Sequence, residues 1–231
     1  MFIGHIAVAM GAKKVAPKTS LGTLIISAQF LDLLWPIFLI LGIEHVRIDV
    51  GNTAVTPLDF YDYPISHSLL TSIGWSILVS LVYFAVRKYK MGAWVVGAGV
   101  FSHWILDFIS HRPDMPIAPG LHSYFGLGLW YSRPATLIVE GLMFLAGIIL
   151  YIRTTKAIDR IGKYAFWSFI GFLVIVWMAN TFGPPPNDVN ALGYIGISLW
   201  LLVLWAYWID KHRKPVVKAI GNHLPLAVSK R

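Results

Sequence analysis

The segment MGAWVVGAGVFSHWILDFISHRPD, residues 91–114, decides how the rest of the sequence is interpreted. Its first part is almost entirely apolar and has about the length, roughly 20 residues, that an α-helix needs to cross a bilayer. His103, Asp107 and His111 follow at intervals of four, and Asp114 comes three residues later. Residues three and four apart share one face of a helix, so we expect these four side chains to line one edge of a membrane helix. Titratable groups at such positions are costly and mark functional sites by default.

The composition indicates a membrane protein. Of 231 residues, 57% are hydrophobic and 13% are charged, whereas soluble domains carry roughly 25% charged residues. No cysteine is present, which excludes disulfides and thiolate metal sites and leaves His, Asp, Glu and backbone oxygens as metal ligands. The net charge of +8 is typical of Lys and Arg gathered in cytoplasmic loops. Because no basic and aromatic binding module is visible, we expect no nucleic-acid partner.

Six apolar segments are long enough to span a membrane: residues 21–43, 67–86, 91–110, 134–152, 164–182 and 191–209. The apolar run before Lys13 is too short to span a bilayer and predicts a half-helix or re-entrant segment that carries His5. We therefore predict an all-α, polytopic bundle of six transmembrane helices plus this short N-terminal half-helix. Residues 1–210 form one membrane-embedded domain, and residues 211–231 form a basic tail on the membrane surface or without order.

Charged residues alternate between the two sides of this bundle. The segments at 13–18, 87–90 and 153–163 and the tail are basic, whereas the loops at 44–66, 111–133 and 183–190 are acidic or nearly neutral. The positive-inside rule then predicts that both termini are cytoplasmic and that the two long loops are outside. On this interpretation Glu44, His45 and Asp49 are solvated loop residues.

Polar residues from separate predicted spans converge in the outer half of the membrane. At a rise of about 1.5 Å per residue, that layer contains His5, Asp32, His67, His103, Asp107, His111 and Glu140. Neutral imidazole and carboxylate bind divalent cations well. We predict a divalent metal ion, zinc as first choice, with six ligands: His5, Asp32, His67, His103, Asp107 and His111.

Simpler interpretations of the same residues remain open. His103 and Asp107 are also explained as a structural pair that holds one helix to its neighbour. Asp32 is explained by a hydrogen bond between helices. His67 is explained as the interfacial start of a helix that Ser66 caps.

Three motifs carry a resemblance to a known family: Gly4-His5, Ser66-His67-Ser68, and Ser102-His103 with Asp107. Over residues 1–115 the chain resembles the YdjM-type membrane-bound metal-dependent hydrolases of the bacterial inner membrane, a family distantly similar to zinc-dependent phospholipase C. Two positions differ from the family pattern, because Asp32 stands alone in the acidic motif and Tyr63-Pro64-Ile65 replaces its His-Arg-Gly. The resemblance implies a multi-pass protein of the bacterial inner membrane with a hydrolytic metal site.

These observations predict a metal-dependent hydrolase with a site open to the outer leaflet. Its partners are membrane lipids and a lipid-like or small-molecule substrate, and the bond cleaved is a phosphoester or ester. Asp114 or Glu140 transfers the proton, and Arg112 and Arg133 bind an anionic head group. One alternative is a proton- or divalent-cation-coupled transporter or channel that uses the same carboxylates. Another is a membrane scaffold with a structural metal.

Overall fold

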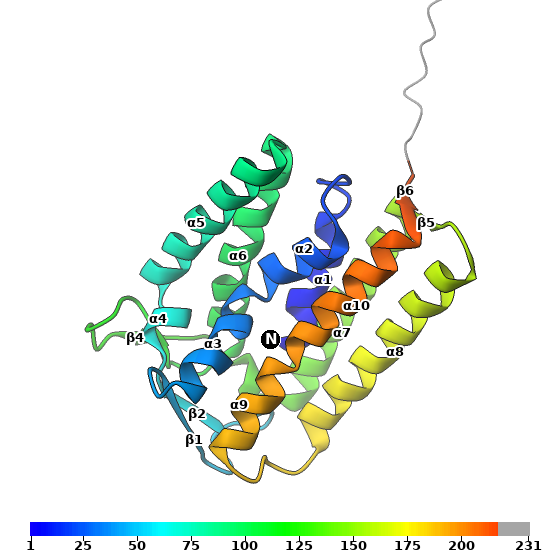
Figure 1. The fold of residues 1–231 in the computed structure, drawn as a ribbon. Helices are drawn as coiled ribbons and strands as arrows, with labels where there is room; N and C mark the ends of the chain where they lie inside the picture. Colours follow the sequence, from blue (N-terminus) through cyan, green and yellow to red (C-terminus); the bar gives the residue numbers. More distant parts are fainter. Residues whose placement is uncertain (217–231) are drawn as a thin grey trace, which may run out of the picture.

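The structure, a computed structural model, describes residues 1–216 as one bundle of helices (Figure 1). Five long apolar stretches can each cross a membrane: α5 (Leu69–Arg87), α6 (Lys90–Ser110), α7 (Arg133–Thr154), α8 (Arg160–Phe182), and the pair α9 (Val189–Ile197) and α10 (Leu199–Lys211). The helices α2 (Leu21–Ala28) and α3 (Phe30–Ile40), bent by 61° at their junction, pass the same test only as a pair, so the described residues hold five such spans, or six if this pair counts as one. The predicted all-α, multi-pass membrane architecture is confirmed.

The bend between α2 and α3 brings the first span against α6. Ser27 donates a hydrogen bond to the Leu24 carbonyl of its own helix, a contact that bends helices. Gly99 of α6 lies so close to this point that an added Cβ would come within 2.4 Å of Ser27 Oγ. The glycine therefore allows α6 to approach the bend, and His103 lies one turn further along α6.

The helix α1 (Phe2–Ala12) is the predicted half-helix, and it begins inside the bundle (Figure 1). Met1 is buried, and its amino nitrogen lies 2.7 Å from Asp107 Oδ1. Gly147 of α7 contacts the α1 backbone, where an added Cβ would lie 2.8 Å from Ala7 Cα. The carboxyl end of α1, near Lys13, reaches the end of the bundle that carries the basic turns. The sequence had predicted that the amino terminus itself lies at that end. The reason is that α1 is apolar around most of its circumference and is therefore enclosed by other helices.

The connections lie at two opposite ends of the bundle (Figure 1). One end carries the acidic and neutral loops, which include the pair β1 (His45–Ile48) and β2 (Leu58–Asp62), the short α4 (Pro64–His67), the pair β3 (Met115–Pro116) and β4 (Tyr124–Phe125), and the 3₁₀ turn η1 (Leu129–Tyr131). The other end carries the basic turns and the pair β5 (Thr155–Ala157) and β6 (Arg213–Pro215). Because β6 pairs with β5, the first residues of the predicted tail are ordered, and residues 217–231 lie outside the described part.

Two apolar clusters fill the bundle. The larger one joins α1, α2, α7, α8 and α10 and occupies the half of the molecule near the basic turns, with Ile6, Met10, Leu24, Tyr151 and Phe166 fully buried. The smaller one lies between α3, α6 and the acidic loops and includes Trp35, Tyr63 and Trp104. The polar residues of the predicted site lie where these two clusters meet.

Candidate functional site

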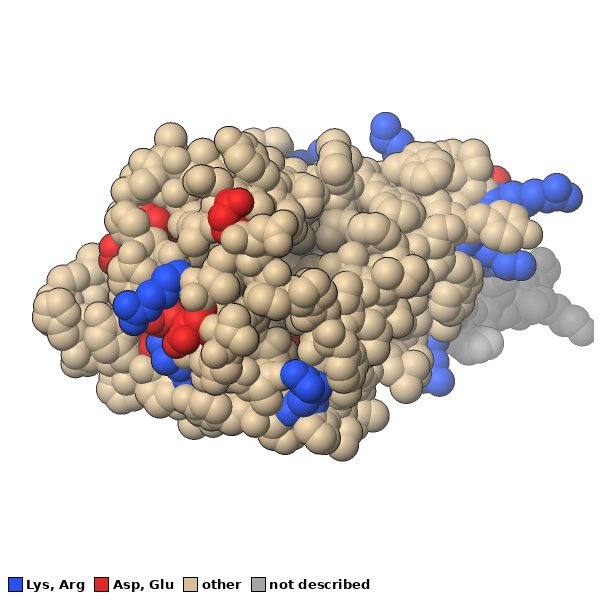
Figure 2. Space-filling view, turned by 90° about the horizontal axis from the view of Figure 1, so that it is seen from below, with Lys and Arg blue, Asp and Glu red and all other residues tan. Residues whose placement is uncertain are grey.

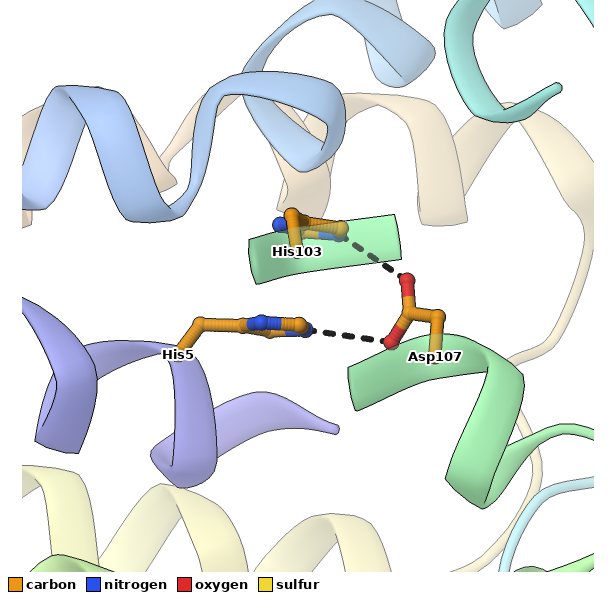
Figure 3. A group of neighbouring side chains, drawn as sticks. All are labelled: His5, His103 and Asp107. Atoms are coloured by element: carbon orange, nitrogen blue, oxygen red, sulfur yellow. Dashed lines mark hydrogen bonds and ion pairs between the residues drawn. The ribbon is translucent and has the colours of Figure 1, made fainter. Parts of the chain in front are cut away.

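The carboxylate of Asp107 contacts two histidines with its two oxygens (Figure 3). His5 Nε2 lies 3.1 Å from Oδ1, and His103 Nε2 lies 3.0 Å from Oδ2. The rings of His5 and His103 are stacked, with centroids 3.7 Å apart and planes inclined by 4°. His103 and Asp107 therefore share one face of α6, as the four-residue spacing predicted. The short helix α1 brings His5 to that face.

Asp32 and His67 complete what we call the central cluster: His5, Asp32, His67, His103 and Asp107. Asp32 Oδ1 lies 3.6 Å from Nε2 of both His67 and His103. His67 Nε2 lies 3.8 Å from Asp107 Oδ2. The helices α1, α3, α4 and α6 thus each contribute to one cluster, in which only Asp32 has appreciable solvent exposure.

The hydrogen bonds of His103 and His67 determine which ring nitrogen is free. His103 Nδ1 lies 2.8 Å from the Ala28 carbonyl oxygen, and because a carbonyl only accepts, Nδ1 carries the proton. His67 Nδ1 lies 2.6 Å from Ser66 Oγ, whose hydroxyl donates to Glu44 Oε2 at 2.6 Å. Since a hydroxyl donates once, His67 Nδ1 must be the donor to Ser66. In neutral rings, both Nε2 atoms therefore present lone pairs to the cluster.

This arrangement requires a positive charge between the side chains. The Nε2 lone pairs of His67 and His103 face the carboxylate oxygens of Asp32 and Asp107, so acceptors face acceptors. His103 Nε2 is buried and has no hydrogen-bond partner, and unpaired buried polar atoms are costly. No Lys or Arg side chain pairs with the cluster among residues 1–216, where its one cationic contact is the Met1 amino group. A divalent cation or additional protons on the rings would supply the charge.

The donor atoms meet the distance requirement for a metal. One nitrogen or oxygen each from His5, His103 and Asp107 lie within 4.8 Å of one another, and so do those of Asp32, His67 and His103. Imidazole nitrogen and carboxylate oxygen are ligands that zinc, manganese and iron accept. Five of the six predicted ligands are therefore together, in two overlapping sets that share His103.

The sixth predicted ligand, His111, belongs to a separate group that we call the outer cluster: Asp59, Tyr63, His111, Arg112 and Asp114. His111 Nδ1 and the Tyr63 hydroxyl both contact Asp114 Oδ1, at 3.0 and 3.2 Å. Burial, followed by the nearby Asp114 carboxylate, raises the pKa of Tyr63 well above its usual range, so the phenol keeps its proton and donates it. Arg112 joins Asp114 to Asp59.

A cavity of about 900 Å³ joins the two clusters to the exterior. Among the residues that line it are Asp32, His67, Asp107, Arg133 and Glu140. Glu140 is buried, and its Oε2 has no hydrogen-bond partner in the described chain. Arg133 is exposed, whereas Arg112 is held by two carboxylates. Of the two predicted proton carriers, Glu140 lines the cavity and has a buried, unpaired Oε2 among the described residues, whereas Asp114 is paired.

The sequence interpretation missed Glu44, which is not a solvated loop residue. Its side chain is fully buried and accepts hydrogen bonds from the Ile65 amide, the Ser66 amide and the Ser66 hydroxyl. The loop folds back under α4 because the first amides of a short helix need acceptors. The Ser66-His67 pair could have indicated this role for Glu44. A serine that accepts the proton of a metal-binding histidine needs an acceptor for its own hydroxyl, and a nearby carboxylate can be that acceptor.

No family model, no curated protein and no solved structure matches this chain. The resemblance drawn from the motifs therefore stays a prediction, and the function is argued from the site.

Proposed function

We propose that this protein is a membrane-embedded, metal-dependent hydrolase that cleaves a lipid-like phosphoester or ester. The observation that carries this proposal is that Nε2 of both His67 and His103 faces the carboxylates of Asp32 and Asp107, in a cluster that the cavity reaches at Asp32, His67 and Asp107. The cavity opens near the acidic loops, and the positive-inside rule places those loops outside. The proposed location is the bacterial inner membrane, from the resemblance in the first 115 residues.

The central cluster would hold the metal ion. His103, His67 and Asp107 have the best-defined surroundings, and His5 and Asp32 complete the donor set. When bound, a divalent cation such as zinc supplies a Lewis acid that makes water a nucleophile near neutral pH.

The residues around the cluster have distinct tasks. Ala28 and the Glu44–Ser66 pair fix the orientation of His103 and His67 by binding their Nδ1 protons, as partners of metal-binding histidines do. Glu140 accepts the proton of the attacking water, because its carboxylate lines the same cavity. Arg133 binds the anionic part of the substrate. Arg112 has a structural role, since Asp59 and Asp114 already neutralise its charge.

The apolar packing favours hydrolysis over transport. A transporter needs a route from the central cluster to the basic end of the bundle. That half is filled by the larger apolar cluster, whose residues Ile3, Ile6 and Leu24 have no solvent exposure. The described residues therefore enclose the central cluster on that side.

Metal analysis tests the proposal directly. We expect the purified protein to retain about one or more divalent cations per chain and the His103→Ala variant to lose them, because a ligand is removed. Elemental mass spectrometry on detergent-purified protein measures this, with the exposed His122→Ala as the matched control. A folded native protein that neither retains nor takes up zinc, manganese or iron would contradict the hydrolase. Loss of the fold with the metal would instead favour the structural-metal scaffold.

Glu44→Gln should weaken metal binding by about 10- to 100-fold, the usual cost of losing the partner of a metal-binding histidine. The glutamine NH₂ group would donate to Ser66 Oγ, so the serine hydroxyl would turn and donate to His67 Nδ1. His67 would then carry its proton on Nε2 and lose the lone pair that faces the cluster. Competition with a chelator gives the dissociation constant.

The matched control is Asp49→Asn, which changes an exposed acidic residue of the same loop. Equal metal affinity in the Glu44 and Asp49 variants would show that Glu44 does not act on the cluster.

A further inference from the structure

Part of the cavity is lined by apolar residues of helices long and apolar enough to span a membrane. We call this part of the cavity the lateral arm and define it by six apolar residues: Phe172, Val176, Trp177, Leu199, Leu202 and Trp205. The C-terminal half of α8 forms one wall, and α9 with α10 forms the other. Because α8 and the pair α9 and α10 are long and apolar enough to cross a membrane, we infer that the arm lies at the depth of the lipid chains.

Three polar side chains along the lateral arm bond to their own helices or to a neighbouring one. Thr181 Oγ1 donates to the Trp177 carbonyl, and Ser198 Oγ donates to the Ile195 carbonyl. Trp205 Nε1 donates to the Ala165 carbonyl. Because these three donors are already used and the six defining residues are apolar or aromatic, the arm offers mainly apolar surface and suits a hydrocarbon chain better than a polar metabolite.

A positive charge without an acidic partner stands where the lateral arm meets the loops. Arg133 at the start of α7 donates to the Ala54 carbonyl at 2.6 Å, and its guanidinium carbon lies 5.4 Å from the ring centre of Phe182. No carboxylate pairs with Arg133 within residues 1–216, in contrast to Arg112. Seen from this end, charged side chains form a few separate groups on a largely uncharged surface (Figure 2). An arginine in that position favours a phosphate, which it binds through paired hydrogen bonds.

We propose that the substrate is an anionic phospholipid whose alkyl chain lies in the lateral arm and whose phosphate is bound by Arg133. That this lipid is hydrolysed rests on the proposed function, whereas the binding of the lipid to the lateral arm and Arg133 does not. A cavity of about 900 Å³ has room for a head group and part of a chain, because pockets of roughly 300–1,000 Å³ enclose most of a drug-sized molecule. Moving an alkyl chain from the bilayer into the arm gains little free energy, because the surrounding lipid chains are equally apolar. The arm therefore fixes the position of the lipid, whereas Arg133 contributes the binding affinity.

Photolabelling of the native protein in nanodiscs tests this binding. The probe is phosphatidylglycerol with a diazirine on one acyl chain, and labelled residues are located by mass spectrometry. We expect labels on the α8 and α10 walls of the lateral arm. Val176→Trp should fill the arm and reduce that labelling severalfold, and Leu199→Trp should do the same from the opposite wall. Arg133→Gln should lower labelling by about tenfold, the cost of a lost charged hydrogen bond, and remove the preference over phosphatidylcholine.

The matched control is Ile175→Trp, because Ile175 neighbours Val176 on α8, is 68% exposed and does not line the cavity. Equal labelling of the Ile175 and Val176 variants, or labels spread evenly over all lipid-facing helices, would overturn the proposal. Equal competition by glycerol phosphate and by the intact lipid would also overturn it, since the site would then bind a soluble phosphate. Labelling requires neither metal nor turnover, so its result is independent of the metal analysis.

Discussion

Asp107→Asn is expected to lower hydrolysis by about 1000-fold or more, because the metal contributes several kcal/mol to transition-state stabilisation and each 1.36 kcal/mol is tenfold. Asp107 contacts all three histidines of the central cluster, with Oδ1 toward His5 and Oδ2 toward His67 and His103. Asparagine keeps the size of the side chain but replaces one oxygen by an NH₂ group that cannot bind a cation. Turnover of the lipid that the native protein cleaves, measured beside metal content, checks both effects.

The matched control for Asp107→Asn is Asp62→Asn. Asp62 is exposed and pairs with the exposed His45 on the hairpin of β1 and β2. We expect this variant to retain native turnover and metal. A folded Asp107→Asn protein with turnover within tenfold of native would remove Asp107 from the reaction.

The fold could be predicted because its main signals are local. Six apolar stretches, the basic turns between them and the shortness of the run before Lys13 are each visible in a window of about 20 residues. The bend within the first span was not predicted, since it depends on how Ser27 and Gly99 meet, and that is a contact between separate helices. The bend also provides the Ala28 carbonyl that orients His103.

The candidate site was predictable where its residues share a helix or a depth. The four-residue spacing predicted that His103 and Asp107 share a helix face. Their calculated depth in the membrane predicted that Asp32, His67 and His5 lie near them. The same four-residue spacing wrongly placed His111 on that helix face, because α6 ends at Ser110 and the chain turns away with His111 in an extended conformation. Periodicity applies only while the helix continues.

Residues in loops were interpreted by composition, and here the sequence misled. Glu44 was interpreted as solvated, yet its carboxylate is enclosed by the amides of α4. Arg112 was predicted as a substrate ligand, and in the structure it pairs with Asp59, which is distant in the sequence. Pairing between distant residues decides whether a loop charge is solvated, and no local pattern in the sequence encodes that pairing.

Lys13→Met is expected to destabilise the protein by about 3 kcal/mol, the lower part of the range for breaking a buried ion pair. Lys13 belongs to the basic segment that orients the bundle, yet its side chain is only 3% exposed and donates to Asp210 Oδ1 at 2.9 Å and to the Thr19 carbonyl. Its removal leaves the Asp210 carboxylate unpaired at the end of α10, so thermal unfolding followed by tryptophan fluorescence should shift downward by several degrees.

The double variant Lys13→Met with Asp210→Leu should recover most of the lost stability, because removing both charges of a buried pair is often close to neutral. The exposed Lys14→Met is the matched control, and equal unfolding temperatures for the Lys13 and Lys14 variants would contradict the prediction. The consequence extends to the site, since Lys13 ties the end of α1 to α10 and the same helix carries His5 to Asp107. A loss of metal affinity in Lys13→Met that the double variant does not restore would show that this ion pair holds α1 in position for metal binding.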